Sequence, residues 1–345
     1  MLAVVCLPCA AYVCAVLAHA PLAPGINESL ETASEIPDPS KSWAIYGELH
    51  EGGEAQYYFF NVTKGQRILI SLFKPATPED EEFLPAFALL GPDLIAQGSI
   101  PSYVEVPSGA VAVVVNGEQS SSAMYEPFSP SSIYQLAELD AEAPASSVYF
   151  IAVFEPSRGG HYGLAVGYVE TFTISEWVLI PFSQIAIYQW ERQSLALILA
   201  PLAATLVVGA VLALWGWKRN SMFRTAFAWA AAIVGLLFIG TGVMLVSQTI
   251  LSLTTAPLVA EVGVTVLFAL LPMAFGAGAL RLSTRTRVDT KTRIYLAALG
   301  VAALFLWAGL IVGPVLAIVG SVLPTRRRAE GVGKEEEKKV ESNAA

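Results

Sequence analysis

Hydrophobic residues are spread unevenly along the 345-residue chain, and their pattern changes near residue 194. Before this point, short runs rich in Val, Ile, Tyr and Phe are separated by clusters of Gly, Pro, Asn and Ser, which is typical of β-strands and turns. After it, long apolar runs follow one another, with Glu261 near one end of the third, and each is long enough for a helix that crosses about 30 Å of hydrocarbon. The pattern therefore predicts a region of strands followed by a region of membrane-spanning helices.

The strand region is predicted over residues 46–175, after an N-terminal linker at 21–45. Its candidate strands are AQYYFFNVT, RILISLF, FALLGPDLIA, GAVAVVVNG, SVYFIAVFE and HYGLAVGYVETF. The first two are interpreted as the arms of one hairpin, with Gly65 in the turn. Because no amphipathic helix intervenes, we expect an antiparallel β-sandwich, jelly-roll-like in form. Residues 117–147 are interpreted as an elaborated loop rather than as core.

Four transmembrane helices are predicted over residues 194–323, which places the fold in the α+β class with strands and helices in separate regions. The predicted spans are 194–217, 225–248, 257–280 and 294–323, and a polar charged tail follows at 324–345. The fourth run is over-long and is interrupted by Pro314. It is either one kinked helix or a segment that partly re-enters the membrane and returns. Residues 176–193 connect the two regions, lying either in the outer headgroup layer or packed under the sandwich.

Basic residues predict which loops face the cytoplasm. They are Lys218, Arg219 and Arg224 between the first two runs, and Arg281, Arg285, Arg287, Lys291 and Arg293 between the last two. The positive-inside rule therefore puts these two loops in the cytoplasm and the strand region outside it. The prediction is a multi-pass protein of the cell membrane. Four spans would leave the tail outside, although it opens with three arginines at 326–328, so the side of the tail stays open.

The first 20 residues are apolar and end in Ala18-His19-Ala20, with small residues where signal peptidase requires them. They are interpreted as a signal peptide at 1–20, with an uncleaved anchor helix as the alternative. All three cysteines lie in this segment, so the mature chain would contain no disulfide, thiolate metal site or cysteine nucleophile.

Charge narrows the range of partners. Residues 21–193 carry 22 acidic and 6 basic side chains, a net charge of −16, although charged residues make up only 14% of the whole chain. A strongly acidic surface argues against nucleic acid as a partner. The expected partners are the lipid bilayer and, beyond it, another membrane or envelope protein or a surface glycan.

Candidate sites are few. His50 with Glu51 and Glu54 could form a weak metal site, but a histidine beside glycines is more often a turn residue, and no spaced ligand motif supports the metal. None of the usual catalytic motifs is present, so no enzyme activity and no cofactor are expected.

Two further patterns concern glycosylation and helix packing. Asn27 and Asn61 begin N-glycosylation sequons, and Asn27, in a loose N-terminal segment, is favoured as the acceptor. In the helical region, Gly309 with Gly313 and Ala274 with Gly278 repeat small residues at a spacing of four. This spacing favours close packing within the bundle, with a dimer interface as the alternative.

The order of strand motifs resembles the bacterial and archaeal pre-peptidase C-terminal (PPC) type of β-sandwich. The residues that carry the resemblance are Gly47-Glu48-Leu49, Tyr58–Val62 with Gly65 and Ile68–Ile70, Val148–Val153 and Gly160–Val166. Two departures are Glu54-Ala55-Gln56 in place of the usual Asp, and the region 98–147, which has no clear equivalent. The resemblance implies a non-catalytic accessory or binding module.

Together these patterns predict an integral cell-envelope protein that displays an acidic β-sandwich for binding, adhesion, surface architecture or accessory service to a membrane complex. The alternative is a sensor or transport subunit, in which the transmembrane helices carry the function and the sandwich regulates it. Four spans exceed what anchoring requires, which is the main reason to keep this alternative.

Overall fold

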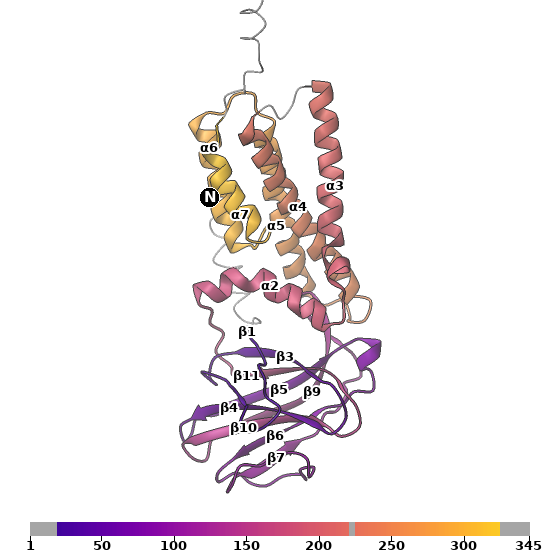
Figure 1. Ribbon diagram of the computed structural model, residues 1–345, viewed down its shortest axis with the longest axis vertical. Helices are drawn as coiled ribbons and strands as arrows, with labels where there is room; N and C mark the ends of the chain where they lie inside the picture. The colour runs from indigo at the N-terminus through magenta and orange to yellow at the C-terminus, as the bar shows by residue number, and fades with distance from the viewer. Residues whose placement is uncertain (1–18, 221–224, 325–345) are drawn as a thin grey trace, which may run out of the picture. The chain divides into compact units, whose positions relative to one another are not determined.

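The computed structural model describes residues 19–220 and 225–324 (Figure 1). Residues 1–18 of the predicted signal peptide, Arg224, the side chains of Lys218 and Arg219, and the tail from 325 lie outside the described part. The chain divides into two compact units. One comprises the chain up to Leu199 together with Leu245–Leu267, and the other comprises Ala200–Met244 together with the chain from Phe268.

The first unit contains a β-sandwich, which confirms the predicted fold class. One sheet, called sheet A here, has the strand order β1-β3-β11-β5-β9-β8, and the other, sheet B, has the order β2-β4-β10-β6-β7. The strands are β1 (Ala20–Leu22), β2 (Ser34–Glu35), β3 (Trp43–Leu49), β4 (Glu54–Val62), β5 (Arg67–Pro75), β6 (Ala86–Gly91), β7 (Val111–Val115), β8 (Met124–Glu126), β9 (Ser131–Glu142), β10 (Ser147–Glu155) and β11 (Gly160–Val166). Neighbouring strands are antiparallel except for the parallel pairs β1–β3 and β2–β4.

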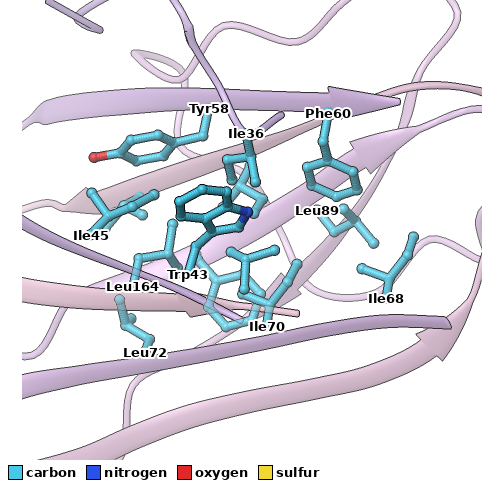
Figure 2. Packing of buried hydrophobic residues seen from close by; sticks show 14 of the residues in the cluster. Ile36, Trp43, Ile45, Tyr58, Phe60, Ile68, Ile70, Leu72, Leu89 and Leu164 are labelled. Atoms are coloured by element: carbon cyan, nitrogen blue, oxygen red, sulfur yellow. The ribbon is translucent and has the colours of Figure 1, made fainter. Parts of the chain in front are cut away.

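The core lies between the two sheets and follows from side-chain alternation along each strand. In β5, Ile68, Ile70 and Leu72 are fully or almost fully buried and point toward sheet B. Figure 2 shows these residues packed with Tyr58 and Phe60 of β4. Burying an aliphatic or aromatic side chain contributes about 1.5–3 kcal/mol, so this apolar layer is the main source of the domain's stability.

Two details of the sandwich differ from the sequence interpretation. Strands β4 and β5 belong to different sheets, so the hairpin prediction is wrong: Gly65, with φ of +83°, lies in a connection that crosses from sheet B to sheet A. The loop interpretation of 117–147 is also wrong, because this segment contains β8 and β9. Strand β9 is 12 residues long and pairs with β5 along its length. Its Ser, Glu and Gln residues obscured the strand pattern in the sequence, and only its second half alternates regularly between exposed and partly buried positions.

A helix follows the sandwich. α2 (Ile174–Trp190) begins at Thr173, whose hydroxyl accepts a hydrogen bond from Glu176 N while the Glu176 carboxylate accepts one from Thr173 N. This capping box satisfies two of the amides that a helix start leaves unpaired. The Glu176 carboxylate also lies 2.6 Å from Lys41 Nζ. Residues 176–193 are therefore mostly helical, and their contacts with sheet A match packing under the sandwich.

The helical region contains α3 (Leu195–Asn220), α4 (Ala226–Ser252), α5 (Val262–Ser283), α6 (Thr290–Phe305) and α7 (Val312–Ser321). Within the described residues, three helices, α3, α4 and α5, are long and apolar enough to cross a membrane. The fourth predicted span differs from the structure, because it is divided into α6 and α7. At 1.5 Å per residue these helices measure about 24 Å and about 15 Å, and each is shorter than the roughly 30 Å hydrocarbon layer.

α6 and α7 form a helical hairpin (Figure 1). Its open end is closed by a hydrogen bond of 2.6 Å from Arg293 Nη1, near the start of α6, to Ser321 O at the end of α7. Its turn contains Trp307, Gly309 and Leu310 with positive φ angles. Gly309 N donates to Thr241 Oγ1 of α4 at 2.8 Å. An irregular turn between apolar helices needs internal partners for its backbone groups, and Thr241 supplies one of them.

Small residues in the second unit allow close packing. A Cβ atom added at Gly309 or Gly313 would lie 2.8 Å from the ring of Phe238 in α4. These two predicted packing residues therefore contact a helix of their own bundle. Ala274 is exposed, and Gly278 has only one neighbour in ordinary contact. The tighter contact on α5 is made by Gly276, where a Cβ would lie 2.5 Å from Gly235 O.

Candidate ligand cavity

The outer face of sheet A, opposite the core, is apolar at its centre. In β5 the residues that alternate with the core positions are Leu69, Ser71 and Phe73. Tyr46 of β3 and Ala165 of β11 lie on the same face. A sheet face of this kind requires a cover.

Helix α2 provides that cover from within the same unit (Figure 1). Ile187 and Trp190 pack on Phe73 and Ala165. Trp190 Nε1 donates to Gly47 O and to Tyr162 O, each at 3.2 Å, which holds the indole over β3 and β11. Gln184 Nε2 donates to Phe128 O at 2.7 Å and ties the helix to the turn between β8 and β9. These contacts hold the middle and the C-terminal end of the helix against the sandwich.

Between these attachments the helix and sheet leave a cavity of about 330 Å³. Small-molecule sites occupy about 300–1,000 Å³, so the volume suits a small ligand. The lining comes from β3, β5, β8, β9, β11 and α2, with His19 and Pro21 at the N-terminal end. Its main members are Tyr46, Phe73, Phe128, Ile180 and Trp190 among the apolar side chains, Ser71, Ser129, Ser131, Gln135, Ser183 and Gln184 among the neutral polar ones, and Glu126, Glu138 and Glu170 among the charged ones.

Three aromatic rings form one wall of this cavity. Tyr46 and Trp190 have ring centroids 5.1 Å apart, Phe73 and Trp190 5.9 Å apart, and Tyr46 and Phe73 6.0 Å apart, all in edge-to-face arrangement. Edge-to-face packing is favourable because the positive edge of one ring meets the negative face of another. The wall is therefore fixed before any ligand arrives.

Glu126 is a cavity-lining carboxyl group with a strongly shifted pKa. Burial, and then the nearby charge of Glu170, raise the pKa of Glu126 to about 7, although a hydrogen bond from Phe128 N to its Oε1 opposes the shift. The side chain keeps some accessible surface, and this surface lines the cavity. Burial, followed by the charges of Glu126 and Glu191, also raises the pKa of Tyr46. The cavity thus contains a carboxyl group that changes charge near neutral pH.

An ion pair anchors the end of α2 to the sandwich. Asp80 is fully buried, and its two carboxylate oxygens accept from Arg192 Nε and Nη2 at 3.0 Å each. Burial opposes the charge, but Arg192, Thr77 and the amide of His161 outweigh it and lower the pKa of Asp80. Arg192 has a φ of +63°, a conformation that non-glycine residues rarely adopt and that this pairing helps to hold.

The predicted metal residues lie in the turn between β3 and β4. His50 Nδ1 is 3.3 Å from Glu54 Oε1, while Glu54 Oε2 accepts from the amides of His50 and Glu51. The hydrogen bond that the His50 imidazole donates to Glu54, and the charge of this carboxylate, raise the pKa of His50. Glu54 is thus engaged with the turn, and residues 19–220 and 225–324 contain no group of three or more His, Cys, Asp or Glu placed to hold a metal.

The two sequons have opposite exposure. Asn27 is 2% exposed, and its backbone oxygen accepts from Tyr57 N at 2.7 Å. Asn61 lies near the end of β4 with its side chain exposed. The folded domain therefore presents Asn61 better than Asn27, which reverses the order expected from the sequence.

Strand β1 uses residues from the predicted signal peptide. Ala20 is fully buried, its amide donates to Ser42 O at 2.9 Å, and His19 Nδ1 bonds Ser42 Oγ at 2.5 Å. Cleavage after Ala20 stays a prediction, and it would remove His19 from the cavity lining.

Sequence reasoning did not find the cavity. Glu126 and Phe128 lie in the segment 117–147, which the sequence interpretation treated as a loop, and Trp190 lies in the connection 176–193, for which the outer headgroup layer was one of two interpretations. One signal was available: Leu69, Ser71 and Phe73 alternate with core residues and are partly apolar, which indicates that the outer face of β5 is covered.

No protein-family model matches this chain, and no curated protein matches it. Among solved structures, the chain is similar to the Methylococcus capsulatus secreted protein MopE, in which an oxidized tryptophan facilitates copper binding. The similarity covers 46% of this chain and 90% of the other, at 12% identity and a TM-score of 0.13. A TM-score this low supports no inference about fold or function.

Proposed function

We infer that this protein is a membrane-anchored binding protein whose β-sandwich holds a small ligand between sheet A and α2. The observation that carries the proposal is the preformed cavity, which combines fixed aromatic rings with a carboxyl group of raised pKa. Pockets of this composition are the usual sites of small-molecule recognition. The PPC-like resemblance, which implies a binding module, belongs to the same proposal.

A second candidate function, ligand sensing, is favoured by contacts behind the cavity wall. Tyr125 OH donates to Thr265 Oγ1 at 2.9 Å, and Ser132 Oγ lies 3.1 Å from Thr255 Oγ1. Thr255 lies in the connection between α4 and α5 and Thr265 lies near the start of α5, while Tyr125 and Ser132 flank the cavity-lining segment 126–131. Movement of this segment on ligand binding would therefore reach the connection between two apolar helices.

The proposed location is the cell membrane, with the sandwich outside the cytoplasm. Charge supports this orientation, because the loop between α5 and α6 is basic and the connection between α4 and α5 has no basic residue. The α6–α7 hairpin returns the chain to the side on which α6 begins, so the described chain ends on the proposed cytoplasmic side, where the positive-inside rule also expects the arginines that follow in the sequence. Three spans with a re-entrant hairpin thus remove the conflict that four spans created.

Ligand retention tests the binding proposal. The full-length chain would be purified in mild detergent from native membranes, and its denatured extract analysed by untargeted mass spectrometry. A Ser183→Phe variant fills the cavity from α2, whereas Ala186→Phe adds the same ring on the exposed side of that helix. We expect one small molecule in wild type and Ala186→Phe, and its loss in Ser183→Phe.

The proposal would be contradicted if Ser183→Phe and Ala186→Phe both fold and their extracts contain the same small molecules in the same amounts. Folding would be checked by circular dichroism, so that loss of the molecule reports on the cavity and not on unfolding.

Cysteine labelling tests the orientation. The test uses a thiol reagent that does not cross membranes and a chain with Ser at positions 6, 9 and 14. Cysteine at Thr284 should react only after the cells are permeabilised, whereas cysteine at Ser120 should react in intact cells. The reverse pattern would contradict the topology.

A further inference from the structure

We propose that the cavity between sheet A and α2 binds a small organic cation. The ligand would carry a primary or quaternary ammonium group on a short apolar body, with no phosphate or carboxylate of its own. This inference rests on the proposed function, because it names the ligand class for the same cavity.

Charge is the first argument. The charged residues lining the cavity are Glu126, Glu138 and Glu170, and the described lining contains no Lys or Arg. His19 also lines it, but burial lowers the pKa of its imidazole, so it adds no positive charge near neutral pH. An anionic ligand would therefore meet charges of its own sign, whereas a cation would meet opposite charges.

The aromatic wall is the second argument. Ammonium groups are attracted to the faces of aromatic rings, and such rings gathered around a pocket are a known means of recognising quaternary ammonium ligands. Tyr46, Phe73, Phe128 and Trp190 all line this cavity. An apolar ligand without charge would also be favoured by these rings, but it would gain nothing from the carboxylates.

The state of Glu126 connects the two arguments. Burial in the cavity wall disfavours a carboxylate at this position and raises its pKa, and a bound cation would supply the counter-charge that the described lining lacks. Affinity for a cation should therefore rise as pH increases through about 7. The titratable and charged groups around Glu126 are Tyr46 on β3, Glu138 on β9, Glu170 after β11, His19 before β1 and Glu191 after α2, while α2 itself presents the neutral Ser183 and Gln184.

Ammonium groups also occur on lipid headgroups, next to a phosphate. The acidic lining disfavours that neighbouring phosphate, and the cavity of about 330 Å³ is small. We therefore place free monocations ahead of phosphocholine, and the experiment separates the two sources.

The test compares two molecules of nearly the same shape, choline and 3,3-dimethyl-1-butanol, in which a neutral carbon replaces the nitrogen. Binding to the full-length chain in detergent would be measured by calorimetry at about pH 6 and about pH 8. Choline should bind at least about tenfold more tightly than the alcohol at the higher pH, and its affinity should fall at the lower pH. Phosphocholine should bind more weakly than choline.

Two Glu→Gln variants, one inside the cavity and one outside it, refine the test. Glu126→Gln should reduce choline affinity about tenfold, remove its pH dependence and leave the alcohol unaffected. Glu142→Gln, on the exposed end of β9 and outside the cavity lining, should leave both affinities unchanged.

Equal affinity for choline and the alcohol, unaffected by Glu126→Gln, would overturn the cation inference and leave the ligand cavity of the proposed function in place. Binding of neither molecule would also overturn it, while a small molecule lost only from the Ser183→Phe extract would still support the proposed function. Phosphocholine binding as tightly as choline would overturn the exclusion of anionic ligands.

Discussion

The two faces of sheet A are made by the same strands, but one packs against sheet B and the other borders the cavity under α2. On the inner face, Ile70 of β5 and Leu164 of β11 are fully buried against sheet B. On the outer face, Leu69 of β5 and Tyr46 of β3 keep partly accessible surface that borders a cavity. The inner face is closed by a second sheet, and the outer face by a single helix that contacts it at separated points.

This difference shows how a β-sandwich can provide both a stable core and a binding site. A sheet packed against a sheet interdigitates along its whole area, which leaves few voids. One helix covers only a strip of a sheet, so space remains beside it for polar groups such as Glu126. We therefore expect changes on the inner face to affect stability, and changes on the outer face to affect ligand binding and pH response.

The largest effect is expected from adjacent residues on opposite faces of β5. Ile70→Ala should reduce the free energy of unfolding by about 2–5 kcal/mol, because it leaves a hole in a fully packed core. Leu69→Ala should cost on the order of 1 kcal/mol or less, because the residue borders an existing cavity. Chemical denaturation of the full-length chain, followed by the β-sheet signal in circular dichroism, would measure both. Equal losses would show that the two faces are packed alike.

The anchor of α2 should have the next largest effect. Asp80→Ala leaves Arg192 without its buried partner and should destabilise the domain by on the order of 3 kcal/mol. The matched control is Asp140→Ala, which removes an exposed partner of Arg67 and should cost about 1 kcal/mol or less. Unfolding curves of the two variants would separate these cases. Similar small losses would mean that the ion pair does not hold the helix in place.

A smaller effect is expected from pH. Burial raises the pKa of Glu126 to about 7 and of Glu191 to about 8, above their ordinary value of 4.5. Between about pH 4.5 and pH 8 the folded state therefore binds more protons than the unfolded state, so the free energy of unfolding falls as pH rises. The change is at most about 1.4 kcal/mol for each pKa unit.

Glu126→Gln should make this decline shallower, whereas Glu142→Gln should preserve it. Asp80, whose pKa is lowered, loses its stabilising charge only at more acidic pH and does not affect this window. Denaturation at several pH values would measure the slope. An unchanged slope in Glu126→Gln would show that this carboxyl ionises as freely as one in water.

The sequence predicted the sandwich, and three of the four spans that it predicted are long apolar helices in the structure, because these patterns are local. Alternating residues such as Ile68 and Ile70, and uninterrupted apolar runs, reveal strands and spans without knowledge of partners. The sheets to which β4 and β5 belong could not be read from local patterns. Their short connection at Gly65 suits a hairpin, and only pairing with β10 and β9 decides otherwise.

The cavity was missed for a related reason. Trp190 near a predicted span looks like a membrane-interface anchor, and Glu126 in a stretch rich in Ser and Pro looks like a solvated loop residue. Only the fold brings them to one face of sheet A. Likewise, Pro314 indicated an interruption, but the structure places the break before it, between Phe305 and Val312, and brings Arg293 and Ser321 together across the hairpin.

The most direct test uses a single cysteine at Ser183, in a chain with Ser at positions 6, 9 and 14, and compares thiol reagents of opposite charge. The ratio of the two labelling rates at Ser183→Cys would be divided by the same ratio measured at Ala186→Cys, on the exposed side of α2. We predict that the trimethylammonium reagent is favoured over the sulfonate reagent by about tenfold at Ser183→Cys, and that adding Glu126→Gln largely removes this preference. Equal normalised rates for the two reagents, or a preference for the sulfonate, would contradict an acidic cavity that admits small cations.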